Sequence, residues 1–296
     1  MGSLVVIIGP SKGFGRALVK ATLSSSEITR VGERCVFILI TTNRERTVNT
    51  WNELYEEIRG KRFSDDAESG IEVFVEETDL GNTTQCLALC EILRIMMGQI
   101  HLMIDHFYLF LNAGTVTPAG PLLNTSEYTD PALASDESFL LNLQQHAMIN
   151  FNSVVTVSRL FVNAMLHRKP RSHCLQVSLI NVSSLAAVQE IYGLSIYGAI
   201  KAARDSILRS FCLEVACNFS SVDCKFLNYA PGLMLTDLVE RNLLDKTSPP
   251  NEIRDSPQKY ADPDKSAARC ISLISDYRNS WRNGSHIDFY DKVEYD

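Results

Sequence analysis

Tyr197 and Lys201 stand four positions apart and are the residues of this chain that most directly suggest chemistry. On a helix, residues at this spacing lie on one face, so the phenol and the ammonium point the same way. A free tyrosine has a pKa of about 10 and donates protons poorly near neutral pH. A nearby cation lowers that pKa and makes the hydroxyl a usable general acid. The pair therefore predicts proton transfer, although an exposed tyrosine above a solvated lysine has the same spacing.

A second candidate site follows the first apolar run of the chain. Residues 4–8 are continuously apolar and predict a buried central strand, which ends at a turn containing Gly9, Gly13 and Gly15. A helix pattern follows the turn. Glycines let the backbone approach a ligand closely, and helix N–H groups point at anions, so this arrangement predicts a phosphate cradle. An ordinary glycine-rich turn is the alternative.

The remaining chain alternates apolar strands with helical patterns. Further strands are expected at 35–41, 71–75, 106–111, 174–182, 222–228 and 286–290. Further helices are expected at 51–58, 83–97, 137–167, 195–217 and 266–274. This alternation predicts a single α/β domain over residues 1–296, a doubly wound, Rossmann-type parallel sheet with helices on both faces. Ligands of such sheets bind beyond the carboxyl ends of the strands, where the motifs of this chain fall.

Two proline-containing breaks mark the segment 244–265, at Ser248-Pro249-Pro250-Asn251 and at Asp262-Pro263-Asp264. We interpret this segment as a mobile substrate loop that closes over a site. A plain surface loop is the alternative interpretation.

The composition of the chain argues against several classes of protein. The chain has 296 residues, 45% of them apolar, and a formal net charge of −7, which argues against a general nucleic-acid binder. No apolar run approaches the roughly 20 residues needed to span a bilayer. The apolar stretch at residues 1–9 is too short for a signal peptide and has no basic residues before it. Eight cysteines without a Cys-x-x-Cys pair predict free thiols, no metal site and a cytoplasmic location.

Together these residues resemble the short-chain dehydrogenase/reductase family over nearly the whole chain. Gly9, Gly13 and Gly15 match its cofactor turn, Asp79-Leu80 its adenine-lining pair, and Asn112-Ala113-Gly114 its strand end. Three positions depart from the usual pattern: Ile8, Pro10 and Leu111. The resemblance implies cofactor contacts at Gly9, Ser11, Lys12, Gly13, Phe14, Gly15, Asn43, Arg44, Asp79, Leu80, Asn112, Ala113, Gly114, Lys201, Leu235 and Thr236.

The same resemblance implies a catalytic tetrad of Asn150, Ser184, Tyr197 and Lys201. Ser184 precedes Tyr197 by the family's usual thirteen residues, and Asn142 is the alternative to Asn150. Hydride would attack a carbonyl carbon, and Tyr197 would protonate the oxygen that Ser184 hydrogen-bonds. Lys201 would lower the tyrosine pKa and bind the nicotinamide ribose, and Asn150 would hold a relay water.

The choice of cofactor can be argued from residues 41–46. This stretch has no acidic residue where NAD sites bind the ribose 2′-hydroxyl, and Arg44 suits a 2′-phosphate. Lys12 and Arg16 add positive charge near the glycine turn. These residues predict NADP(H), although a solvated loop cation is the alternative for Arg44.

The substrate prediction depends on Asp288, in the stretch Asp288-Phe289-Tyr290-Asp291-Lys292. This stretch resembles the branch of the family that reduces side-chain carbonyls of pterins on the route to tetrahydrobiopterin. A pterin presents an amino group beside a ring N–H, and a carboxylate accepts both in parallel hydrogen bonds. The resemblance implies substrate contacts at Ser184, Leu185, Tyr197, Gly232 and Asp288.

Other interpretations remain open from the sequence. If Asp288 is only a surface carboxylate, the chain fits a carbonyl or quinone reductase of broader specificity. A more distant alternative is a non-catalytic NADP-binding regulator. The resemblance also implies a homodimer, in which helices 137–167 and 195–217 pair across a two-fold axis.

Overall fold

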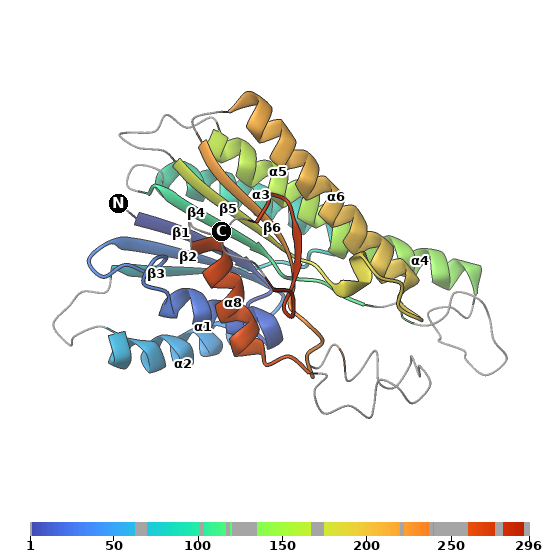
Figure 1. The fold of residues 1–296 in the computed structure, drawn as a ribbon, viewed down its shortest axis with the longest axis horizontal. Coiled ribbons are helices and arrows are strands. Elements are labelled where there is room, and N and C mark those ends of the chain that lie inside the picture. Colours follow the sequence, from blue (N-terminus) through green and yellow to red (C-terminus); the bar gives the residue numbers. More distant parts are fainter. Residues whose placement is uncertain are drawn as a thin grey trace.

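The computed structural model describes residues 2–62, 70–100, 104–116, 119, 135–166, 175–219, 222–236, 239, 260–275 and 281–292. Its seven described strands form one parallel sheet in the order β3-β2-β1-β4-β5-β6-β7 (Figure 1). The strands are β1 (Gly2–Ile8), β2 (Arg34–Thr41), β3 (Ile71–Glu77), β4 (His106–Leu111), β5 (Leu175–Val182), β6 (Val222–Ala230) and β7 (His286–Asp288). The predicted doubly wound α/β sheet is confirmed, and its order reverses between β1 and β4.

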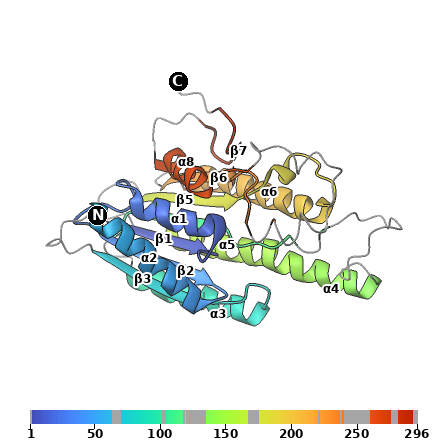
Figure 2. The same ribbon diagram turned by 90° about the horizontal axis from the view of Figure 1, so that it is seen from below.

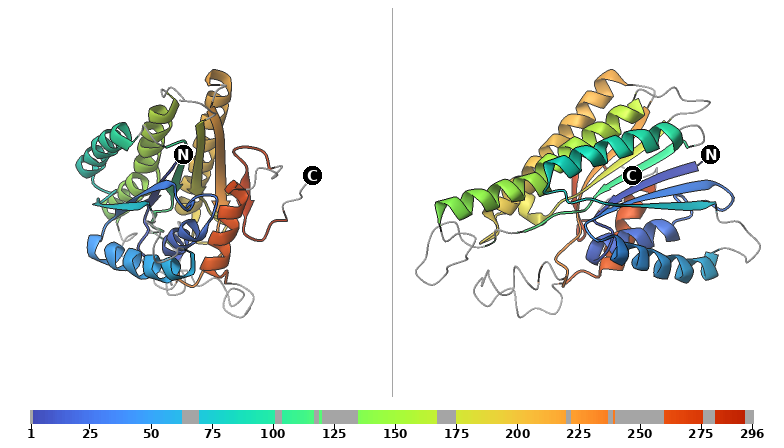
Figure 3. Two further views of the ribbon diagram at one scale, coloured as in Figure 1. Left: turned by 90° about the vertical axis from the view of Figure 1, so that its left-hand side faces the viewer. Right: turned by 180° about the vertical axis from the view of Figure 1, so that it is seen from behind.

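Helices cover both faces of the sheet (Figures 2 and 3). One face carries α1 (Gly13–Ser24), α2 (Arg44–Arg62) and α8 (Pro263–Ser275). The other carries α3 (Thr83–Ile100), α5 (Ser153–Leu166) and α6 (Ser195–Asn218). Helix α4 (Asp136–Ala147) continues the line of α5 past the end of the sheet (Figure 2).

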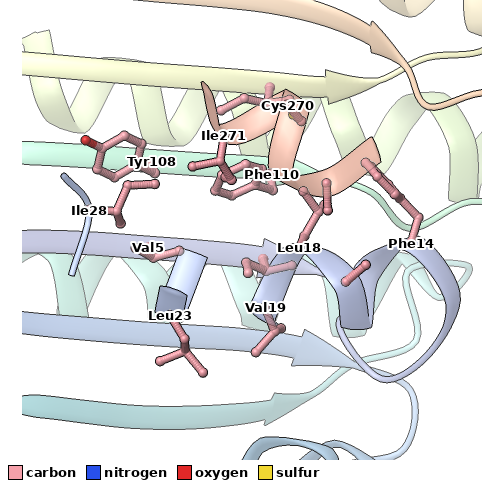
Figure 4. Packing of buried hydrophobic residues seen from close by; sticks show 14 of the residues in the cluster. Val5, Phe14, Leu18, Val19, Leu23, Ile28, Tyr108, Phe110, Cys270 and Ile271 are labelled. Atoms are coloured by element: carbon pink, nitrogen blue, oxygen red, sulfur yellow. The ribbon is translucent and has the colours of Figure 1, made fainter. Parts of the chain in front are cut away.

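The continuous apolar run of β1 is explained by burial on both faces. Val5 and Ile7 belong to the core under α1 and α8, whereas Leu4 and Val6 belong to the core under α3 and α5. Figure 4 shows the first of these cores from close by. A central parallel strand has no solvent face, so it needs no alternation of polar residues.

The single helix expected at 137–167 is interrupted. A π-helical turn, η3 (Met148–Asn152), separates α4 from α5. Such turns are rare, and they occur frequently at functional sites.

The predicted boundary between the loop 244–265 and the helix 266–274 was wrong. Helix α8 begins at Pro263, and the Asp262 carboxylate oxygen Oδ1 accepts the N–H groups of Asp264 and Lys265 at 2.8 and 3.1 Å. Proline is favoured at the first helical position and aspartate at the cap before it, so this sequence starts a helix here. Residues 244–259 of the proposed substrate loop lie outside the described residues.

The last strand is shorter than expected. Strand β7 ends at Asp288, and Phe289 and Tyr290 form a turn.

The described part of the chain bears on the expectations about cysteines, membrane spans and metal sites. The seven cysteines there form no disulfide. No helix within the described ranges is long and apolar enough to cross a membrane. Within the same ranges, no group of three or more His, Cys, Asp or Glu residues could hold a metal ion.

Candidate active site

A cavity of about 1250 Å³ opens at the carboxyl ends of the strands. Typical pockets for drug-sized ligands measure about 300–1,000 Å³, so this cavity has room for an extended ligand and a second molecule. Both the glycine turn after β1 and the helix that carries Tyr197 contribute to its wall. The cavity therefore lies where the strand order reverses, the usual ligand position in such sheets.

The glycine turn is shaped for close backbone approach. Gly9 and Gly13 have φ angles of 78° and 53°, in the left-handed region that favours glycine. A Cβ on Gly15 would lie 1.9 Å from the Gly9 carbonyl oxygen, which also accepts a hydrogen bond from Asn112 Nδ2 at 2.8 Å. Helix α1 has no side-chain cap hydrogen bond from Lys12, its N-cap residue. Uncapped N–H groups at a helix start fit a bound phosphate.

Most of the residues that the sequence predicts to bind the cofactor line the cavity. The predicted residues that line it are Gly9, Ser11, Lys12, Gly13, Phe14, Gly15, Asp79, Leu80, Asn112, Ala113, Gly114, Lys201, Leu235 and Thr236.

Asn43 and Arg44 are predicted cofactor residues that do not line the cavity. Asn43 Oδ1 accepts the Arg46 N–H at 2.8 Å and so caps α2. The Arg44 N–H donates to Glu77 Oε2 at 3.1 Å. Both residues directly follow Thr42, which does line the cavity.

Arg16 was expected to add positive charge near the turn. Its Nη2 instead lies 2.6 Å from Glu53 Oε1, an ion pair between α1 and α2. The paired carboxylate offsets that charge.

Ser184, Tyr197 and Lys201 lie together on the cavity wall. Ser184 follows β5, and its Oγ accepts the Ala186 N–H at 3.2 Å. Tyr197 lies in the first turn of α6, close enough to the Ser184 hydroxyl for that group to influence its pKa. Lys201 Nζ lies 5.4 Å from the centroid of the Tyr197 ring and donates to the Val182 carbonyl at 2.6 Å.

The electrostatics of this group differ from the expectation. Burial raises the pKa of Tyr197, while the Arg204 guanidinium and the Ser184 hydroxyl oppose that rise. Burial, followed by the charge of Arg204, holds the pKa of Lys201 well below its usual value, and Asp205 opposes this. The cation that favours the Tyr197 phenolate in this structure is Arg204, because burial disfavours the charged form of Lys201.

Asn150 is fully buried and lies beside the cavity rather than on its surface. It belongs to η3, and its side chain bonds both backbone groups of Thr115: Oδ1 to the N–H at 3.0 Å and Nδ2 to the carbonyl at 2.9 Å. The alternative, Asn142, donates to Ser138 within α4 at 2.8 Å. A Cβ on Gly114 would lie 2.7 Å from Asn150 Oδ1, which ties this asparagine to the strand end after β4.

The remaining predicted substrate residues also lie on the cavity wall. Leu185, Gly232 and Asp288 line it. Asp288 Oδ1 accepts the Tyr290 N–H at 2.9 Å, and the Asp288 N–H donates to Asp291 Oδ2 at 2.7 Å. These two bonds hold the Asp288 carboxylate in a defined turn at the cavity wall.

Several lining residues were not predicted, including Thr115, Val116, Gln189, Glu190, Ile191, Tyr192, Leu194 and Met234. Their positions in the sequence follow predicted motifs by only a few residues, which is the one signal that could have found them. Arg204 and Asp205 were also missed, although they continue the face of Tyr197 and Lys201 along α6.

Comparison with known proteins gives the family. Residues 3–246 match the family model for short chain dehydrogenase. The chain is 26% identical to sepiapterin reductase of Rattus norvegicus, covering 98% of this chain and 97% of the relative. It is 27% identical to sepiapterin reductase of Xenopus tropicalis, covering 97% and 96%.

Among solved structures, L-sorbose reductase from Gluconobacter frateurii, complexed with NADPH and L-sorbose, superposes with a TM-score of 0.65 at 22% identity. That comparison covers 97% of this chain and 94% of the other, and it supports the fold. The matched family region contains the glycine turn, the strand ends and the Tyr197–Lys201 pair. This chain belongs to the short-chain dehydrogenase family and is an oxidoreductase with a site for a nicotinamide cofactor.

Proposed function

We propose that the enzyme uses NADPH to reduce side-chain carbonyls of pterins, such as sepiapterin and 6-pyruvoyl-tetrahydropterin, in tetrahydrobiopterin biosynthesis. One observation carries the proposal: Asp288 lines the same cavity as Ser184 and Tyr197. The Asp288 carboxylate can orient the pterin ring while the hydroxyls of Ser184 and Tyr197 meet the side-chain carbonyl. The similarity to sepiapterin reductases over nearly their whole length supports this assignment.

The proposed proton donor is Tyr197. When bound, NADPH supplies the hydride that adds to the carbonyl carbon. The carbonyl oxygen then gains an electron pair and takes the phenolic proton of Tyr197, leaving an alcohol and a phenolate. Ser184 donates a hydrogen bond to the same oxygen, and such oriented donors contribute several kcal/mol. The raised pKa of Tyr197 keeps the phenol protonated at neutral pH, as an acid requires.

The cofactor assignment rests on the shape of the glycine turn. Under this proposal the turn and the start of α1 hold the pyrophosphate, because a Cβ at Gly15 would fill the cradle. Asp79 and Leu80 take the adenine, and Arg44 takes the 2′-phosphate. Lys201 would hold the nicotinamide ribose, and Leu235 and Thr236 would also contact the cofactor.

The remaining parts of the proposal follow the family resemblance. Asn150 positions the strand end after β4 for a relay water, through its two bonds to Thr115. Leu185 and Gly232 contact the substrate. The chain acts as one domain, in the cytoplasm, as a homodimer that pairs through α4, α5 and α6. Gel filtration with light scattering tests the dimer.

The Asp288→Ala variant tests the function. We expect it to raise the KM for sepiapterin by at least about tenfold, since a charge-assisted hydrogen bond contributes about 1.5–3 kcal/mol. Turnover of a small diketone, which has no pterin ring, stays within about twofold of the wild type. Asp264→Ala is the matched control, because its carboxylate pairs with Lys20 on α8's exposed side. Equal effects of Asp288→Ala on both substrates contradict the proposal.

A broader carbonyl or quinone reductase is the second candidate. Four lining residues expose apolar side chains: Leu185, Tyr192, Leu235 and Tyr290 are 43–58% exposed. An apolar rim suits flat aromatic carbonyls. A higher kcat/KM for quinones than for sepiapterin, unchanged in Asp288→Ala, favours this candidate.

A further inference from the structure

A buried polar network lies behind the cavity, between α6 and the last strands of the sheet. Arg204 Nε donates to Asn181 Oδ1 at 2.7 Å. Asn181 Nδ2 lies 2.9 Å from both Asp205 Oδ1 and Asn228 Oδ1. The other carboxylate oxygen, Asp205 Oδ2, lies 2.7 Å from His286 Nδ1. The network therefore runs from helix α6 through β5 and β6 to β7.

The network connects helix α6, which carries Tyr197, to strand β7, which carries Asp288. Asp205 follows Tyr197 by eight residues on α6, so both lie on one helix face. His286 and Asp288 are two residues apart on β7, so their side chains leave the same face of the strand. The His286–Asp205 bond thus joins the helix that carries the proposed acid to the strand that carries the proposed substrate carboxylate.

Strand β7 is held by its ladder with β6, by the core packing of Ile287 and by hydrogen bonds in the flanking turns. The His286–Asp205 bond adds a side-chain contact from α6. The strand is three residues long and lies at the edge of the sheet formed by the described strands, where it pairs with β6. The chain leaves the strand at Asp288, so any shift of β7 moves that carboxylate. Supporting side-chain contacts of this kind hold a ligand-binding residue more precisely.

The bond to Asp205 is well suited to that purpose. The Asp205 side chain is buried, and an ionised carboxylate can only accept, so Nδ1 of His286 carries the hydrogen and donates. A buried carboxylate oxygen without a donor is strongly disfavoured. The imidazole is therefore held in one tautomer and one orientation.

We infer that His286 is a positioning residue for the substrate. By donating to Asp205 it fixes Asp288 at a set distance from Ser184 and Tyr197. This inference rests on the proposed function, because it assumes that Asp288 binds the pterin ring.

Three variants of His286 test the inference. His286→Ala removes the donor. His286→Asn keeps a donor near the Nδ1 position, whereas His286→Gln carries the same amide one bond farther out. The matched control is Asn283→Ala, which loosens the loop before β7 by removing side-chain bonds to Phe226 and Cys224 but leaves Asp205 untouched.

We expect His286→Ala to raise the KM for sepiapterin by about tenfold, because a misplaced contact loses substrate orientation. The kcat for a small diketone and the NADPH dissociation constant stay within about twofold of the wild type. His286→Asn restores most of the sepiapterin KM, and His286→Gln does not. Asn283→Ala leaves that KM unchanged. If His286→Ala does not fold, the comparison of Asn with Gln gives the same test.

Three results overturn the inference: an unchanged sepiapterin KM in His286→Ala or His286→Gln, an equal loss with both substrates, or an equal loss in Asn283→Ala. Asp288→Ala separates this failure from failure of the proposed function. A normal sepiapterin KM in Asp288→Ala overturns the function itself. An elevated KM in Asp288→Ala with normal His286 variants overturns only the positioning role.

Discussion

Replacing Gly15 with alanine tests the cofactor turn. The added Cβ would lie 1.9 Å from the Gly9 carbonyl oxygen and 2.6 Å from Asn112 Nδ2. The first contact is with backbone, so the turn itself must move. Overpacking of this kind costs about 1–3 kcal/mol, and the Asn112–Gly9 hydrogen bond that is displaced contributes about 1 kcal/mol more. We therefore expect a total loss of about 2–4 kcal/mol in the free energy of unfolding.

Urea denaturation and NADPH titration measure the two consequences. With a slope of about 3 kcal/mol per molar urea, the midpoint falls by roughly 1 M. NADPH affinity falls by at least about tenfold, because the backbone N–H groups leave their places around the pyrophosphate. Gly60→Ala is the control, since an added Cβ there meets nothing within 4 Å and alanine favours the helix.

If Gly15→Ala unfolds at the wild-type urea concentration and binds NADPH normally, the turn does not need glycine at this position. The same conclusion follows if Gly60→Ala loses as much NADPH affinity as Gly15→Ala.

Three other substitutions test separate parts of the account. Arg204→Met removes the charge that opposes the raised pKa of Tyr197, so that pKa rises further. Carbonyl reduction needs the protonated phenol, so it then persists to higher pH. Alcohol oxidation needs the phenolate, so it begins only at higher pH. The pH–rate profiles of the two reactions measure both shifts. Arg44→Ala raises the NADPH dissociation constant about tenfold and leaves that of NADH unchanged, as fluorescence titration would show. Asp262→Ala removes the cap of α8 and lowers the free energy of unfolding by about 1 kcal/mol in urea.

Each of these has a contradicting result. Unchanged pH profiles in Arg204→Met would remove that residue from the electrostatics of Tyr197. Equal loss of NADPH and NADH affinity in Arg44→Ala would contradict the 2′-phosphate contact. A urea midpoint for Asp262→Ala that matches Asp264→Ala would show that the cap contributes nothing.

The existence of the strands could be predicted from the sequence. Buried parallel strands such as β1 and β4 are continuous apolar runs, which here stop at Gly9 and Asn112. The π-turn at Met148–Asn152 could not be predicted, since five residues carry no periodic signal of their own. The start of α8 was predicted three residues too late, because Asp262-Pro263 was interpreted as a sequence that interrupts helices. The same pair caps and begins a helix when a helical pattern follows it.

For the site, fixed spacing made Ser184, Tyr197 and Lys201 predictable. The network through Asp205 and His286 was not, because its members lie up to 105 residues apart and meet only in the folded sheet. Lys201 was expected to lower the pKa of Tyr197 through its positive charge. Burial of Lys201 lowers its own pKa and so disfavours that charge, and the spacing of the residues does not reveal burial.

Sepiapterin-dependent oxidation of NADPH by the wild type and by Tyr197→Phe tests the central claim most directly. The variant keeps the ring and removes only the proton donor. We predict that kcat falls by about 10²–10⁴-fold while the NADPH dissociation constant is unchanged. Turnover of sepiapterin by Tyr197→Phe at a rate near that of the wild type would contradict the account.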